Sequence, residues 1–217
     1  MLPYCPEGYF VTPPSADALY RSVNTGDIFQ AMCVKCDEFH NLHVDLGTLN
    51  GIIPRDEVAL GIKNGETKEF AILSRVGKPV SFQVIAFDRN GIAILSRRAA
   101  QEEARSYFLS AVRVGDVIPA VVLNPAEFGV FCDIGCGLAA LLPIAGISVS
   151  RIRHPSDRLR PGMEICAALA SRDGDRVCLT QRELLGTWEE NARRFAQGET
   201  VEGIVRSVED YGVFIEL

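Results

Sequence analysis

Three segments of this chain begin alike, and this internal repeat constrains the fold more than any other feature. They read TGDIFQAMCVKC from Thr25, VGDVIPAVVLNP from Val114 and QGETVEGIVRSV from Gln197. Their shared glycines are Gly26, Gly115 and Gly198, which lie 89 and 83 residues apart. Self-similarity at a nearly constant spacing indicates tandem copies of one structural unit.

The similarity continues after each start through short apolar segments bounded by glycine. HNLHVDLG (40–47), FGVFCDIG (128–135) and YGVFIEL (211–217) fall at matching offsets. In the first two units LNGIIP and LAALLP follow, and each unit closes on a short strand-like segment, GIAILSRR or DRVCLTQR. Short strands with glycine turns at this spacing predict small antiparallel barrels.

Two helical patterns follow the closing strands. Residues 97–115 are rich in helix formers and end near a glycine. Residues 182–198 place Leu185, Trp188, Ala192 and Phe195 at steps of three and four. This spacing predicts one helix face that packs on a neighbouring barrel, and it favours packing over base stacking for Trp188.

The segment AEFGVFCDIG (126–135) separates into two faces, because side chains alternate across a strand. Val130, Cys132 and Ile134 form an apolar face, whereas Phe131 and Asp133 share the other. We interpret Phe131 and Asp133 as facing outward, like His43 with Asp45 and Phe214 with Glu216 in the other units. A planar residue at this offset in every unit favours a binding face. The alternative is an aromatic ring half-covered by a loop or helix.

Together these motifs resemble the S1 RNA-binding domain, which is named for the largest protein of the bacterial small ribosomal subunit. The best match is residues 113–182, through VGDVIPAVVLNPAEFGVFCDIG, LAALLP and DRVCLTQRE. The resemblance implies a mainly β protein of tandem five-stranded Greek-key barrels of the OB type, joined by helical linkers. It covers about residues 22–217.

The repeat and the resemblance together predict a domain division. We expect an N-terminal extension (1–21), a divergent first barrel with an insertion (22–98), a helical linker (99–112), a second barrel (113–182), a second helical linker (183–197) and the start of a third domain (198–217). Because 20 residues cannot complete a five-stranded barrel, we expect the sequence to be a piece of a longer protein.

The resemblance also implies where RNA would bind. In the second unit the family's two aromatics correspond to Phe128 and Phe131, and its arginine corresponds to Arg176. The family's histidine position holds Pro143 here, and its aspartate position holds Arg172 beside Asp173, which puts these polar contacts in doubt. The equivalent aromatic positions are His40 and His43 in the first unit and Tyr211 and Phe214 in the third.

Charge supports a local phosphate contact but not a generally basic surface. The net charge is −6. The run RIRHPSDRLR (151–160) is nevertheless basic, and it offers Arg151, Arg153 and Arg158 to phosphates. A solvated loop is the alternative interpretation of this run.

We therefore expect a non-catalytic, bacterial protein of translation or RNA metabolism that stacks single-stranded RNA with little sequence preference. The alternative is an adaptor whose divergent barrels dock on the ribosome or on an RNA-processing enzyme. An enzyme is disfavoured, because Asp45 and Asp133 are lone carboxylates without a partner at a metal-bridging spacing. No cofactor is expected.

Composition indicates the redox state and the location of the chain and bears on a metal site. The chain holds seven cysteines, an odd number, and its start, MLPYCPEGYF, lacks an export signal. Reduced thiols and a cytoplasmic location are therefore expected, and no apolar run is long enough to span a bilayer. Cys33 and Cys36 form a C-x-x-C motif with His40 and His43 nearby, so zinc at these four residues is an alternative interpretation.

Overall fold

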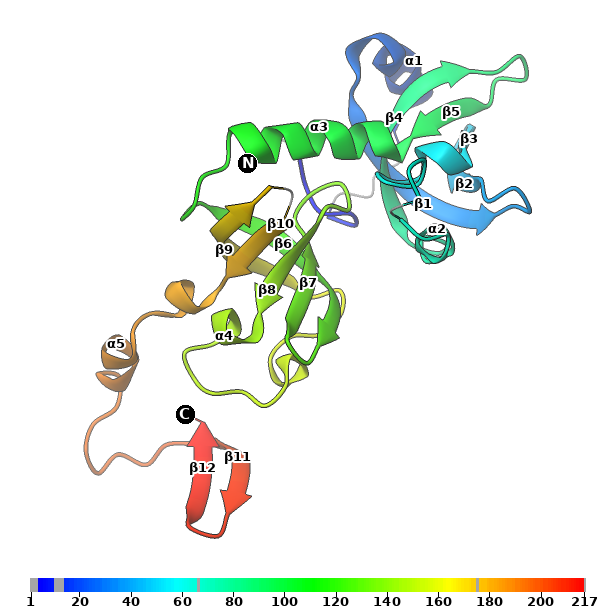
Figure 1. Cartoon of the computed structure of the whole chain (residues 1–217). Helices are drawn as coiled ribbons and strands as arrows, with labels where there is room; N and C mark the ends of the chain where they lie inside the picture. Colours follow the sequence, from blue (N-terminus) through cyan, green and yellow to red (C-terminus); the bar gives the residue numbers. More distant parts are fainter. Residues whose placement is uncertain (1–3, 10–13, 66, 175, 217) are drawn as a thin grey trace.

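The computed structural model describes residues 4–9, 14–65, 67–174 and 176–216. It contains two closed five-stranded barrels, followed by a separate two-stranded sheet. In Figure 1 the long helix α3 lies between the barrels and the red hairpin lies at the far end of the chain. The predicted fold class, mainly β with tandem OB-type barrels, is confirmed.

The first barrel comprises five strands with a helix before it and two short helices inside it. These are α1 (Ala16–Thr25), β1 (Ile28–Cys36), β2 (Leu42–Asp45), β3 (Asn50–Ile53), the 3-10 helix η1 (Arg55–Glu57), α2 (Phe70–Leu73), β4 (Pro79–Phe87) and β5 (Ala93–Ser96).

Helix α3 (Arg97–Ser110) leads into the second barrel and the hairpin. The elements that follow are β6 (Val117–Ala126), β7 (Gly129–Asp133), β8 (Ala139–Pro143), α4 (Ile144–Ile147), the 3-10 helix η2 (Pro155–Asp157), β9 (Glu164–Asp173), β10 (Arg176–Thr180), the 3-10 helix η3 (Arg182–Leu185), α5 (Trp188–Ala192), β11 (Ile204–Glu209) and β12 (Gly212–Glu216).

The two barrels close in the same way. The first has the strand order β1-β2-β3-β5-β4, and the second has the equivalent order β6-β7-β8-β10-β9. Each closure needs one parallel pair, β3 with β5 and β8 with β10, while the remaining pairs are antiparallel. A closed barrel leaves no unpaired sheet edge, so these domains avoid the edge-to-edge association of open sheets.

Alternation along the strands places the cores as the sequence predicts. Leu42, Val44 and Leu46 are at most 2% exposed in the first barrel. Val130, Cys132 and Ile134 are buried to the same degree in the second. Helix α1 adds Leu19 to the first core, so this helix straddles the boundary predicted at residue 22.

Helix α3 begins and ends on side-chain hydrogen bonds. Oγ of Ser96 accepts the backbone N–H of Ala99 at 2.9 Å, which is an N-cap. The helix ends at Ser110, short of the expected residue 115, and its last carbonyls receive a guanidinium described below. One face of α3, including Ala104 and Phe108, packs into the core of the second barrel.

The second predicted helix, over 182–198, is wrong as a continuous element. Gly186 has φ 79° and ψ 168°, which ends η3 after one turn. Thr187 and Glu190 then form a capping box that starts α5 as a separate short helix. The expected packing face is lost, because Leu185 and Phe195 are 40% and 41% exposed. The Trp188 side chain lies outside the described residues.

The third repeat contributes only the hairpin β11–β12. Val213 and Ile215, which the alternation predicts to face a core, are 52% and 56% exposed here. No helix in the described ranges is long and apolar enough to cross a membrane.

Candidate nucleic-acid interface

Two phenylalanines form an exposed aromatic pair on the second barrel. Phe128 precedes β7 and is 57% exposed, whereas Phe131 lies within β7 and is 37% exposed. Their ring centroids are 5.9 Å apart and the ring planes meet at 82°. In this edge-to-face arrangement, parts of both rings remain open to a ligand.

Gly129, between the two phenylalanines, allows β7 and β8 to approach closely. A Cβ atom at this position would lie 2.5 Å from the carbonyl oxygen of Leu142 and 2.8 Å from Cα of Pro143. Both are backbone atoms of β8 and cannot rotate away. The glycine of the aromatic-Gly-Val-aromatic motif therefore serves the close pairing of β7 with β8.

A half-buried apolar row continues from Phe131 across the sheet. Phe131 pairs with Leu141 of β8, and Leu141 pairs with Cys178 of β10. Leu141 and Cys178 are half-buried, and the exposed Arg176 lies two residues before Cys178. Leu141 and Cys178 are not among the predicted site residues, although alternation along LAALLP and DRVCLTQR places them on the outer face.

The basic run forms an ordered loop between α4 and β9. His154 and Asp157 make a capping box around η2: Nδ1 of His154 accepts the N–H of Ser156 at 3.1 Å. Oδ2 of Asp157 accepts the backbone N–H of Arg153 at 3.1 Å. Helix η2 contacts β6, so the loop lies beside the β6–β7 hairpin that carries the phenylalanines.

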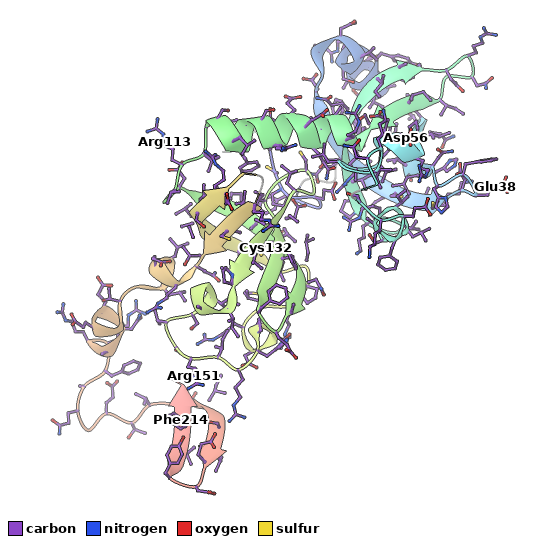
Figure 2. The ribbon with its side chains drawn as sticks, in the orientation of Figure 1. Glu38, Asp56, Arg113, Cys132, Arg151 and Phe214 are labelled. Atoms are coloured by element: carbon purple, nitrogen blue, oxygen red, sulfur yellow. The ribbon has the colours of Figure 1, made fainter. Side chains whose placement is uncertain are left out.

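The arginines of this loop differ in their surroundings. Arg151 is exposed, and Figure 2 labels it at the lower end of the second barrel. Arg153 is also exposed and forms a 2.9 Å ion pair with Glu209 of the third-repeat hairpin. Arg158 is half-buried. Among these three arginines, Arg151 is the exposed one that forms no ion pair within the described residues.

Arg172 has a structural partner that the sequence did not predict. Its guanidinium donates to the carbonyl oxygens of Phe108 at 3.1 Å and Leu109 at 2.8 Å. These are carbonyls in the last turn of α3, where a positive charge is favourable. This geometry accounts for Arg172 without a nucleic-acid contact.

Asp133 corrects the sequence interpretation. It shares a strand face with Phe131, but it is only 1% exposed and does not point into solvent. Its carboxylate accepts three backbone N–H groups, from Glu7 at 2.8 Å, Gly135 at 2.8 Å and Gly137 at 3.0 Å. Burial, followed by the Glu7 carboxylate, raises the pKa of Asp133 to about 7. The residue is covered by the N-terminal segment, which the repeat pattern does not include.

The third-repeat hairpin reproduces the aromatic pair. Tyr211 and Phe214 have ring centroids 6.2 Å apart at an interplanar angle of 86°. They are 82% and 51% exposed, and Figure 2 labels Phe214 on β12. The same two positions of the motif thus place the same ring geometry on two repeats.

The first barrel has a different surface at these positions. Nε2 of His43 lies 3.3 Å from Oδ2 of Asp37, and the same carboxylate accepts the backbone N–H groups of Phe39 and Asn41. Although some desolvation opposes it, these hydrogen bonds lower the pKa of Asp37 to about 2. His40 has a positive φ of 62° and lies in the turn beside this carboxylate. Asp37 is therefore ionised at neutral pH beside His43.

The four residues of the zinc alternative are not brought together. Cys33 is buried in the first core, and burial raises the pKa of its thiol to about 11. His43 instead contacts Asp37 outside that core. Across the described part of the chain, no group of three or more His, Cys, Asp and Glu side chains could hold a metal ion.

Comparison with known proteins finds an S1 domain in this chain and relatives among ribosomal proteins. Residues 111–170 match the family model described as the S1 RNA binding domain. The small ribosomal subunit protein bS1 of Neisseria meningitidis is 36% identical over 150 residues, which is 65% of this chain and 26% of the relative. The bS1 homolog of Bacillus subtilis is 30% identical over 207 residues, covering 92% of this chain and 52% of the relative. A multidomain protein from Streptococcus pneumoniae, with nucleic acid binding domains, aligns at a TM-score of 0.33 and 16% identity over 71% of this chain and 50% of that one.

The chain is therefore an S1-type domain protein, with its family match in the second barrel. The proteins that it resembles over most of its length are bacterial bS1 proteins, and it spans about a quarter to a half of the two relatives described above.

Proposed function

We propose that this chain binds single-stranded RNA on the outer face of its second barrel, in the manner of the ribosomal S1 proteins that it resembles. The observation that carries the proposal is the exposed pair of Phe128, just before β7, and Phe131, within β7, in the domain that matches the S1 family. Solvent-exposed aromatic rings on an OB barrel stack nucleobases, with about 1–3 kcal/mol per base.

Cationic side chains supply the phosphate contacts in this proposal. Arg176 lies on the same face as the apolar row, and Arg151 projects from the loop beside the β6–β7 hairpin. Tyr211 and Phe214 extend the same kind of surface to the third repeat. A strand bound to both repeats would gain affinity from the linkage, because the second contact becomes intramolecular.

Low sequence preference follows from the chemistry of this face. Stacking accepts any base, since every base has a π-face. Phe131 pairs with the apolar Leu141 on one side and with the exposed Asn124 on the other, so Asn124 is the one side chain paired with Phe131 that can read a base edge. We propose a non-catalytic role in translation or RNA metabolism in the cytoplasm, which the names of the bS1 relatives support.

The proposal is tested by titrating the chain with labelled single-stranded RNA of different sequences and with an RNA duplex, at several salt concentrations. Single-stranded oligonucleotides of different sequence should bind with similar affinity, and an RNA duplex should bind more weakly, because its bases are not available for stacking. Affinity should fall with salt, with a slope that reflects a few phosphate contacts. Equal binding of duplex and single strand would contradict the assignment.

A second function is favoured for the first barrel by its charge. Asp37 holds a carboxylate beside His43, at the position where the second barrel exposes Phe131. A carboxylate at this position is unfavourable for a phosphate backbone. We therefore propose that the first barrel acts as an adaptor for a protein of the ribosome or of RNA processing. The Phe128→Ala/Phe131→Ala variant should retain such protein partners in a pull-down experiment as well as the wild type does.

A further inference from the structure

The N-terminal residues 4–9 lie in the seam between the two barrels and contact both. In Figure 1 the blue N-terminal trace passes beneath α3 and between the barrels. These residues precede the repeat, and the repeat pattern assigns them no role. Their contacts distinguish them from a surface tail.

Glu7 joins the two barrels through a single residue. Its backbone N–H donates to Oδ2 of Asp133 in the second barrel at 2.8 Å. Its carboxylate receives the guanidinium of Arg97 at 2.6 Å and 2.9 Å, and the backbone N–H of Ser81 in the first barrel at 3.0 Å. Arg75 adds a longer contact at 3.4 Å. The Glu7 and Arg97 side chains are only 6% and 4% exposed.

Residues on both sides of Glu7 repeat this bridging. The carbonyl of Cys5 accepts the N–H of Cys136 in the second barrel at 3.0 Å. Gln30 of the first barrel donates to the carbonyl of Pro6 at 3.0 Å and accepts the N–H of Gly8 at 2.9 Å. Backbone groups of the segment are thus satisfied by both barrels, as those of a bound peptide are.

Tyr4 fixes the start of the segment to α3. Its hydroxyl donates to Glu103 at 2.8 Å, and its ring lies 5.1 Å from the ring of Tyr107, centroid to centroid. It also packs against the core of the second barrel. One aromatic anchor and one buried acidic anchor, three residues apart, therefore seat the segment.

The buried cation in the seam requires the carboxylate that the N-terminal segment supplies. Arg97 is a buried cation, and its side-chain hydrogen bonds go to Glu7 and to the carbonyl of Val58. A buried charge that loses its partner is strongly unfavourable. In the first barrel, Asp45 occupies the position of Asp133 but is exposed and caps Gly47. Burial of the acidic residue is thus specific to the barrel that the segment covers.

We infer that residues 4–9 are an internal strap, seated in a peptide-binding seam, that locks the two barrels into one rigid unit. The strap ends the stacking face as well. Asp133 lies two residues beyond Phe131 on the same face of β7, and Glu7 covers it. If RNA binds this face as proposed, its contact with β7 therefore ends at Phe131. The first barrel keeps a fixed orientation relative to β7.

The test is backbone ¹⁵N relaxation on the full chain, which reports the tumbling of each barrel separately. The wild-type barrels should share one rotational correlation time. In the double variant Tyr4→Ala/Glu7→Ala each barrel should tumble faster and independently, while the amide spectrum of each stays dispersed. The matched control is Glu38→Ala, which removes an exposed carboxylate from the β1–β2 turn (Figure 2). A double variant with a single, unchanged correlation time would overturn the inference.

Hydrogen exchange of the wild type keeps the inference testable if the double variant does not fold. The N–H groups of Glu7 and Cys136 are bonded between the N-terminal segment and the second barrel. They should exchange much more slowly than amides of an unstructured peptide of the same sequence. Exchange at the unstructured rate would show that the strap is not seated in solution, and would overturn the inference.

Discussion

Phe131 and Asp133 project from the same face of β7, yet Phe131 is 37% exposed whereas Asp133 is 1% exposed. The difference arises because the N-terminal segment covers one end of this face and leaves the other end open. A single strand therefore carries two functions in this account. Phe131 contributes to the nucleic-acid surface, and Asp133 seats the strap that joins the barrels.

Stability should depend on pH through Asp133. Burial and the Glu7 carboxylate raise its pKa in the folded chain from 3.8 to about 7, against the opposing effect of Arg97 and of the backbone N–H groups. Between these two values the folded chain binds a proton that the unfolded chain has lost. The free energy of unfolding should therefore fall as pH rises from about 4 to about 7, by at most about 1.4 kcal/mol per pH unit.

Urea denaturation at a series of pH values measures this dependence. Asp133→Asn should remove this contribution, so the free energy of unfolding should vary less over the same range. The control is Asp45→Asn, which changes the exposed residue at the equivalent position of the first barrel. An unchanged pH dependence in Asp133→Asn would contradict the assignment of this titration.

Gly129→Ala should destabilise the second barrel by about 1–3 kcal/mol, because the new methyl group meets the β8 backbone. Gly212→Ala is the matched control. It changes the same motif position with nearly the same φ, 159° against 158°, but its Cβ meets nothing within 4 Å. Because this φ strains a side chain at both positions, the control measures the backbone cost alone and should be destabilised less than Gly129→Ala in thermal or urea unfolding. Equal effects of the two substitutions would show that close strand pairing is not the reason for Gly129.

Substitutions of Arg172 on β9 and of Arg176 on β10 should have different effects on stability and on RNA binding. Arg172→Gln removes hydrogen bonds to two carbonyls of α3, so it should cost about 1 kcal/mol of stability and leave RNA affinity unchanged. Arg176→Gln should leave stability unchanged, weaken RNA binding and reduce the salt slope by about 1. RNA titrations and urea denaturation of both variants test this, and a loss of RNA affinity in Arg172→Gln would reverse the assignment.

The repeated motifs predicted the barrels because period-two alternation and turn glycines are local properties. Val130, Cys132 and Ile134 could be placed in the core for this reason. The burial of Asp133 could not be predicted, since its cover comes from Glu7, 126 residues away in the chain. The prediction of one continuous helix over 182–198 was wrong for a local reason that the sequence contains. Gly186 ends the first helical turn, and the Thr187–Glu190 capping box starts a separate helix.

The candidate site shows the same division. Phe128 and Phe131 followed from the motif, and their ring geometry agrees with an exposed pair. The partners of Arg172 and His43 depend on α3 and on Asp37, which lie outside the motif positions. The motif positions of the family predict on which strand and face a residue lies. The neighbouring elements determine whether its side chain is available to a ligand.

The central claim is that Phe128 and Phe131 form the RNA-binding surface. The most direct test is a fluorescence-anisotropy titration of the full chain with a labelled RNA single strand of roughly 12 nucleotides. We predict that Phe128→Ala/Phe131→Ala weakens binding at least tenfold, because two stacking contacts are lost. The control Phe39→Ala/Phe70→Ala, which removes two phenylalanines that are 70% and 76% exposed in the first-barrel part of the chain, should bind as wild type does. Wild-type affinity in the Phe128→Ala/Phe131→Ala variant would contradict the account.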